Sequence, residues 1–175
     1  MNQDPKLPEL LRSGLDLVVC GTASSSESAR RRQYYAGPGN RFWSVLSETG
    51  LTPRLLHPSE FPLLLDYGVG LTDIVKDQAG VDIEIDFGDR GTTLRERIAP
   101  YAPRYLCFNG KRAAQEALGR KSVDYGIQEE LFGSTRLFVA TSTSAAARRW
   151  WDSGVWEELA ERVAKGSFPR SALRV

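Results

Sequence analysis

Short apolar runs alternate with stretches of helical periodicity from one end of the chain to the other. Runs rich in β-branched and large apolar residues, typical of buried strands, occupy residues 15–20, 69–72, 104–108 and 136–140. Apolar residues recur at helical spacing over residues 42–49, 61–67, 92–98, 110–118 and 153–163. Strands that alternate with helices favour a parallel sheet with both faces covered. We therefore expect an α/β fold, a three-layer α/β/α sandwich around a central, mainly parallel sheet.

The composition indicates one globular domain. The chain has 175 residues, of which 41% are hydrophobic and 26% charged. No repeat or linker divides it, so we expect a single domain over residues 1–175 with its core at about 12–165 and a frayed tail over 167–175. The net charge of +1 excludes a histone-type protein that coats polyanions, but not DNA binding through local clusters. No apolar run approaches the ~20 residues that span a membrane, and the N-terminus lacks a signal-peptide core, which predicts a cytoplasmic location without membrane contact.

Metal or cofactor chemistry is not expected. Cys20 and Cys107 each lie inside an apolar run and do not pair at metal-ligand spacing. His57, the single histidine, precedes Pro58, a position typical of a helix start or a loop. We therefore expect neither a histidine-dependent catalytic triad nor a histidine-rich metal site in this chain.

Polar segments follow the strands, where ligands bind in sheets of this kind. Residues 21–35 hold small hydroxyl residues and three consecutive arginines, and residues 141–151 hold four hydroxyl residues, three alanines, Arg148 and Arg149. Hydroxyls, open backbone N–H groups and arginines suit phosphate contacts, and the alanines form a slim neck that can enter a groove. A solvated loop and the start of an amphipathic helix are the plainer interpretations of these two segments.

Residues 34–43 combine aromatic residues with a tight turn. Tyr34 and Tyr35 lead through Gly-Pro-Gly to Asn40, which can cap a helix that opens with Arg-Phe-Trp. Such a turn can hold an aromatic ring over the mouth of a pocket, where it can stack on a planar ligand such as a nucleobase extruded from a duplex. The alternative is a loop-to-helix junction with core aromatics.

These motifs resemble the uracil-DNA glycosylase superfamily over most of the chain, about residues 15–163. Asn40-Arg41-Phe42-Trp43 and Phe108-Asn109-Gly110-Lys111 are similar to the mismatch-specific uracil/thymine-DNA glycosylases, as is Leu65-Asp66-Tyr67. Tyr34-Tyr35 and Ser142-Thr143-Ser144 are closer to the hypoxanthine-DNA glycosylase branch. The resemblance implies a base-flipping hydrolase without a cofactor that cleaves the N-glycosidic bond and leaves an abasic site.

The resemblance also implies roles for individual residues. Tyr35 falls where the family stacks a ring on the flipped base, and Asn109 falls near a position that binds the base edge in parts of the superfamily. Residues 142–148 correspond to the loop that enters the duplex, and residues 24–26 to the loop beneath the sugar and phosphate. The expected base contacts are Tyr35, Asn109, Ala23 and Phe42. The expected DNA contacts are Ser24, Ser25, Ser142, Thr143, Ser144, Ala146, Arg148 and Arg149.

Two departures concern catalysis. The mismatch-specific enzymes carry a catalytic Asn where this chain has Ala23, and related enzymes show Asn or His where it has Ser142. Glycosidic hydrolysis passes through an oxocarbenium-like sugar, so it needs a positioned water and stabilisation of the departing base. Asn40 and then Asp73 are the expected catalytic residues, with Glu27 a more remote choice; Asn40 or Asp73 can alternatively act as a helix cap.

The expected substrate is double-stranded DNA that contains a deaminated base, uracil ahead of hypoxanthine, bound by a monomer. The alanine neck fills little volume, so Arg148 is the expected plug, and a weak plug favours mispaired bases, which cost less to unpair. No strand cleavage is expected, because Lys111 lies at a predicted helix start. One alternative, left open by Ala23 and Ser142, is a non-catalytic protein that binds uracil-containing or abasic DNA. Another is a small-molecule-binding α/β protein, although no Gly-rich phosphate loop is present.

Overall fold

The computed structural model describes residues 7–166. The strands are β1 (Leu17–Gly21), β2 (Val69–Asp73), β3 (Tyr105–Asn109), β4 (Gly126–Phe132) and β5 (Thr135–Ala140). The α-helices are α1 (Ser26–Arg31), α2 (Phe42–Glu48), α3 (Arg90–Ile98), α4 (Lys111–Leu118) and α5 (Ser153–Ala164). The 3₁₀ helices are η1 (Pro58–Tyr67), η2 (Asp82–Glu84) and η3 (Ala145–Trp150). The tail expected over residues 167–175 lies outside the described residues.

The strands form one five-stranded sheet in the order β2-β1-β3-β5-β4. β1 pairs in parallel with β2 and β3, and β3 pairs in parallel with β5. β4 lies at the edge of the sheet and pairs with β5 in the antiparallel sense. The predicted mainly parallel sheet is confirmed, and the carboxyl ends of β1, β2, β3 and β5 meet at one edge of it.

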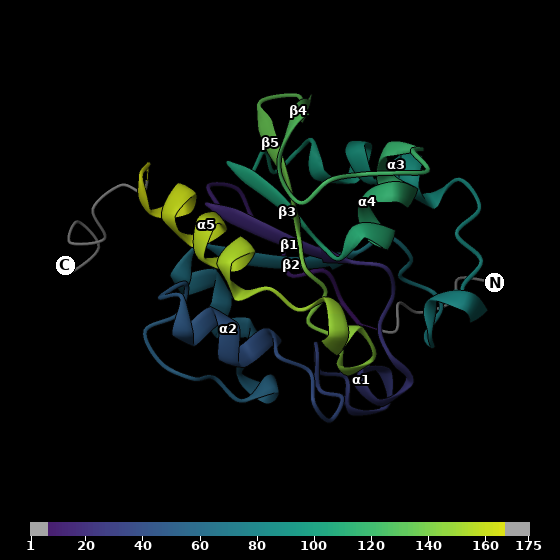
Figure 1. Cartoon of the computed structure of the whole chain (residues 1–175), viewed down its shortest axis with the longest axis horizontal. Helices are drawn as coiled ribbons and strands as arrows, with labels where there is room; N and C mark the ends of the chain where they lie inside the picture. Colours follow the sequence, from purple (N-terminus) through teal and green to yellow (C-terminus); the bar gives the residue numbers. More distant parts are fainter. Residues whose placement is uncertain (1–6, 167–175) are drawn as a thin grey trace.

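Apolar clusters cover both faces of the sheet. In β1, Leu17 and Val19 join the cluster that contains α2 and α5, whereas Val18 and Cys20 join the cluster that contains α3 and α4. Figure 1 shows α2 and α5 on one side of the sheet and α3 and α4 on the other. Because successive side chains of a strand point to opposite faces, a strand covered on both sides is apolar throughout. The predicted α/β/α sandwich is therefore confirmed.

Strand β4 was missing from the sequence-based expectation. It is an edge strand whose central side chains alternate between exposed and half-buried, and its centre, Gln128-Glu129-Glu130, is polar. Glutamate is uncommon in strands, so this segment has no strong strand pattern. The available signal was Gly133-Ser134, a two-residue turn between β4 and β5 in which Gly133 has a φ of +59°.

Helical segments also differ in detail. The serine-rich segment expected as a loop contains the short helix α1, where the Ser25 hydroxyl caps the helix by accepting from the Ser28 N–H at 3.1 Å. The segment expected as a helix over 61–67 belongs to the longer 3₁₀ helix η1. Its capping box pairs His57 with Glu60, which confirms His57 as a helix-start residue.

Candidate functional site

The carboxyl edge of the sheet brings together the ends of four strands. Gly21 and Asp73 are register partners where β1 and β2 end, and Asn109 and Ala140 are register partners where β3 and β5 end. The loops that follow are also joined, since the Ile74 N–H donates to the Gly21 carbonyl at 2.9 Å. The predicted segments are therefore neighbours in space, as their strand ends implied.

Asp73 is a buried carboxylate at this edge. Its side chain is only 4% exposed, and Oδ2 forms an ion pair with Lys76 Nζ at 3.1 Å. The same Nζ donates to the Tyr34 hydroxyl at 2.9 Å, and that hydroxyl donates to the Pro8 carbonyl at 2.6 Å. No helix begins directly after Asp73, since the next helix, η2, starts at Asp82. The helix-cap interpretation of Asp73 is thus not supported, and a cation fixes its carboxylate instead.

Gly21 leaves space for the other carboxylate oxygen. A Cβ on Gly21 would lie 2.7 Å from Asp73 Oδ1 and 3.3 Å from the Tyr35 hydroxyl oxygen. The first separation is too short for any real side chain. Only glycine at position 21 therefore lets these two polar groups face the end of β1.

Tyr35 has a fixed ring and a buried hydroxyl. Its backbone adopts a φ of +51°, and its ring stacks on Phe42 with centroids 4.1 Å apart and planes inclined by 29°. The hydroxyl is buried and its proton has no acceptor among the described residues. Burial, and next the charge of Asp73, raise the pKa of this hydroxyl well above its usual value, while a hydrogen-bonding contact from the Asn109 side chain acts in the opposite direction.

Asn40 lies at the start of α2. Its Oδ1 accepts from the Phe42 N–H at 3.0 Å, so the expected capping contact is present, and its Nδ2 has no hydrogen-bond partner among the described residues. The next residue, Arg41, donates from its backbone N–H to the Thr143 carbonyl at 2.9 Å. This bond holds the tyrosine segment against the last loop of the site.

Asn109 fastens that last loop to the end of β3. Its Oδ1 accepts from the Thr143 N–H at 3.0 Å, and its Nδ2 donates to Thr143 Oγ1 at 2.9 Å. Thr143 is only 1% exposed, so its side chain faces the protein interior. The two residues form a closed amide–threonine pair, and Asn109 has one Nδ2 hydrogen left for another acceptor.

The rest of the loop points outward. Ser142 and Ser144 hold turns, because their hydroxyls accept from the backbone N–H of Ser144 and Ala146 at 3.3 Å each. Ala146, Arg148 and Arg149 are exposed, as DNA contacts must be. The Arg149 guanidinium lies over the ring of Trp150, and that tryptophan is 61% exposed.

The loop after β1 is more structured than expected. Ala23 packs against the apolar cluster of α3 and α4, and the Ser24 hydroxyl is buried with no hydrogen-bond partner within residues 7–166. Ser25 caps α1 and remains exposed. The run of arginines is partly neutralised, since Glu27 pairs with Arg30 and Arg31, which lowers the pKa of Glu27 to about 2 through hydrogen bonds first to Arg30.

Sequence reasoning missed Lys76 and Gly21. Lys76 follows Asp73 by three residues in a segment that is neither helix nor strand, so no periodicity pairs the two side chains. Gly21 directly follows the strand expected over residues 15–20, and only the position of Asp73 on the neighbouring strand shows why glycine is needed there. A lysine shortly after an acidic strand end was the available signal for the ion pair.

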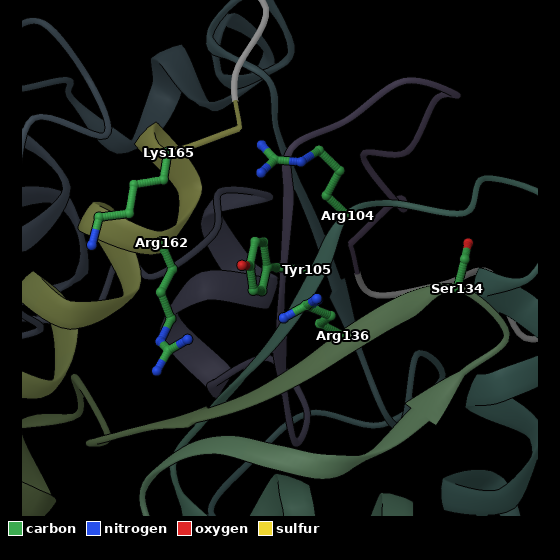
Figure 2. Close-up of a pocket in the computed structure, with 6 residues that line it drawn as sticks. All are labelled: Arg104, Tyr105, Ser134, Arg136, Arg162 and Lys165. Carbon is green, nitrogen blue, oxygen red and sulfur yellow. The ribbon is translucent and has the colours of Figure 1, made fainter.

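A basic hollow of about 310 Å³ lies elsewhere in the protein. Figure 2 shows it between α5 and the beginnings of β3 and β5, which is the amino-terminal edge of these strands. Two of its cations already have partners: Arg104 contacts Asp16 and the Val163 carbonyl, and Arg162 contacts Glu158. None of the predicted site residues lines it. It is lined by Arg104, Tyr105, Ser134, Arg136, Arg162 and Lys165.

Within residues 7–166 no group of histidine, cysteine and acidic side chains could hold a metal ion. Cys20 and Cys107 are buried free thiols. Lys111 begins α4, and its Nζ lies 4.5 Å from the centroid of the Tyr125 ring. No helix among the described residues is long and apolar enough to cross a membrane.

The site therefore offers a carboxylate and a phenol beside a glycine, an aromatic stack and a hydroxyl-rich loop that ends in arginines. A carboxylate can orient a water and stabilise a cationic sugar, and an aromatic stack can hold a planar base. The family model of the uracil DNA glycosylase superfamily matches residues 8–160. Among solved structures, the chain is similar to the solution NMR structure of a candidate uracil DNA glycosylase from Methanosarcina acetivorans, with a TM-score of 0.57. The sequence identity is 21%, over 93% of this chain and 98% of that chain, so this likeness supports the fold.

Proposed function

This chain belongs to the uracil DNA glycosylase superfamily, and from that premise we propose that it hydrolyses the N-glycosidic bond of deaminated bases in DNA. The proposed substrate is uracil, with hypoxanthine second, in double-stranded DNA. The product is an abasic site with the strand intact. The protein acts as a cytoplasmic monomer, because one lesion needs only one such site.

The observation that supports this proposal best is the meeting of Asp73, Tyr35 and Gly21 at the carboxyl edge of the sheet. Ala23 cannot orient a water, since it has no polar side-chain atom. Asp73 Oδ1 is the nearest acidic oxygen to the end of β1, and its partner oxygen is held by Lys76. Asp73 is therefore the group best placed to position the attacking water and to stabilise the developing positive charge on the sugar.

Asn40 is the second proposed catalytic residue. Its Oδ1 is committed to the cap of α2, whereas its Nδ2 is available for a water or for the departing base. An amide can hold a water without charge, or stabilise negative charge on a leaving base by donating a hydrogen bond. Both roles use Nδ2, so they are compatible with the cap.

Base flipping uses the outward parts of the site. One face of the Tyr35 ring is covered by Phe42, and the proposed contact of the flipped base is with the opposite face. Arg148 and Arg149 contact the backbone, and Arg148 takes the place of the extruded base because the alanines before it are too small. A mispaired base costs less to unpair, so U·G is cleaved faster than U·A.

The test uses end-labelled duplexes with a single U·G, U·A, hypoxanthine·T or T·G pair. Each duplex is incubated with the protein and then treated with hot alkali, which breaks the strand at abasic sites. Asp73→Asn keeps the shape of the side chain and removes its charge, and Asn40→Asp keeps the capping oxygen and removes the amide hydrogens. We expect Asp73→Asn to slow base release by at least about 100-fold, the contribution of a positioned acid or base.

The variants separate the two catalytic candidates. A large loss in Asn40→Asp with full activity in Asp73→Asn would assign the water to Asn40. Equal rates on U·G and U·A would contradict the role given to Arg148. Melting temperatures of both variants within a few degrees of the wild type, measured in parallel, exclude misfolding as the cause of any loss.

A damage-binding protein without catalysis is the second candidate function, and Ala23 favours it. The same duplexes distinguish it directly. Intact strands after alkali, together with a gel shift that requires the lesion, would show that the protein binds damaged DNA without cleaving the glycosidic bond.

A further inference from the structure

We infer that the hydroxyl of Tyr35 is a further catalytic group, which holds the attacking water together with Asp73. This inference rests on the proposed glycosylase function and assigns a role to a polar atom that base stacking leaves unused. Stacking needs only the ring of Tyr35, which a phenylalanine would supply equally well. The hydroxyl needs a separate explanation, because it is buried and its proton has no acceptor among the described residues.

The hydroxyl and the carboxylate face the same point. A Cβ on Gly21 would contact both the Tyr35 oxygen, at 3.3 Å, and Asp73 Oδ1, at 2.7 Å, yet these two oxygens form no hydrogen bond with each other. Asp73 cannot turn its Oδ1 away freely, since Oδ2 is paired with Lys76. Tyr35 cannot move freely either, because its ring is stacked on Phe42. A fixed donor and a fixed acceptor at one point form a site for a single small ligand with both hydrogens and lone pairs, and water is such a ligand.

The chemistry of the two groups is complementary. The Tyr35 pKa is raised well above its usual value, so the phenol keeps its proton at neutral pH and donates it in a hydrogen bond to the water oxygen. Asp73 Oδ1 accepts a hydrogen bond from the same water. One lone pair of the water oxygen remains, and it can be directed at the sugar carbon C1′.

The hydrolysis then balances as follows. The water lone pair forms the new C1′–O bond while the C1′–N bond breaks. The electron pair of the broken C1′–N bond leaves with the base. The proton lost by the water passes to Asp73, and the departing base takes up a proton from solvent. Tyr35 keeps its proton throughout, so its contribution is orientation.

The polar side chains of Asn109 and Ser142 at this edge bind within the last loop of the site. Both polar atoms of the Asn109 amide bind Thr143, and the Ser142 hydroxyl accepts from the Ser144 N–H. The Ser24 hydroxyl is also buried without a hydrogen-bond partner in the described part of the chain, but it is not among the three atoms nearest to a Cβ at Gly21. Tyr35 is the buried donor that lies together with Asp73 at Gly21.

The test compares Tyr35→Phe with the wild type in single-turnover base release from whichever duplex the wild type cleaves. Tyr125→Phe is the matched control, because Tyr125 is exposed and its ring contacts Lys111 on α4. Binding is measured separately on a duplex with the 2′-fluoro analogue of the released nucleoside, which resists cleavage. We expect Tyr35→Phe to release the base about 100-fold more slowly, to bind the analogue within about twofold of the wild type, and to melt at the same or a higher temperature, since it loses a buried unpaired hydroxyl.

Two results would overturn the inference. An unchanged release rate in Tyr35→Phe would show that the hydroxyl is not needed for the water. Loss of analogue binding in proportion to the rate would show that the hydroxyl binds the base. A wild-type protein that releases no base would instead contradict the proposed function itself, before any variant is compared.

Discussion

Gly21 is the residue on which two polar groups of the site depend. Its missing side chain lets Asp73 Oδ1 and the Tyr35 hydroxyl approach the end of β1. Both groups are also held by other contacts, since Lys76 pairs with the second oxygen of Asp73 and Phe42 stacks on the ring of Tyr35. A methyl group at position 21 would therefore displace the two groups that are proposed to hold the water. The methyl group itself would not contact DNA.

For that reason we expect Gly21→Ala to lower the rate of base release by about 100-fold or more, the cost of misplacing reacting groups by about 1 Å. Gly37→Ala is the control, because a Cβ there would lie 3.8 Å from its nearest neighbour, an ordinary contact. Single-turnover rates and melting temperatures of both variants decide the matter. Equal activity of the two variants would show that the geometry at Gly21 is not limiting.

Among the elements, the loop after β5 is held in position by hydrogen bonds from three other parts of the chain. Asn109 binds it from β3 through two hydrogen bonds, and Arg41 binds it through the Thr143 carbonyl. The helix after the loop adds a further bond, since Trp156 Nε1 donates to the Thr141 carbonyl at 2.9 Å. The loop is thus rigid at its base, while its exposed arginines remain free to meet a ligand.

Thr143→Val tests this attachment at nearly constant volume. The variant leaves Asn109 Nδ2 without its threonine acceptor, so we expect the free energy of unfolding in urea to fall by about 1–3 kcal/mol. Thr49→Val is the comparison, since the Thr49 hydroxyl bonds only within the last turn of its own helix. A loss no larger in Thr143→Val than in Thr49→Val would show that the loop does not depend on this pair.

Exposed or pocket-lining arginines lie at two opposite ends of the sheet. Arg148 and Arg149 lie after the carboxyl end of β5, and Arg136 lines the basic hollow near its beginning. The net charge of +1 therefore says nothing about which edge meets DNA.

We expect Arg148→Ala to weaken binding to lesion-containing duplex and to reduce the salt dependence of the binding constant by about one charge. Arg136→Ala removes the same charge from the opposite edge, so its binding should match that of the wild type at every salt concentration. Fluorescence anisotropy across a salt series measures both effects. A larger loss in Arg136→Ala would place the DNA at the basic hollow instead.

The sequence alone was enough to predict the sandwich, the parallel strands and the polar segments that follow the strand ends. These features depend on local apolar runs and on the rule that parallel strands end together, both of which can be recognised in the chain itself. Strand β4 was not predictable in this way, because an edge strand with a polar centre has little local signal. The pairing of Asp73 with Lys76, the closure of Asn109 on Thr143 and the unpaired hydroxyl of Tyr35 were decided only in three dimensions. They arise where segments distant in the chain pack together, and the partner of a buried polar group depends on that packing.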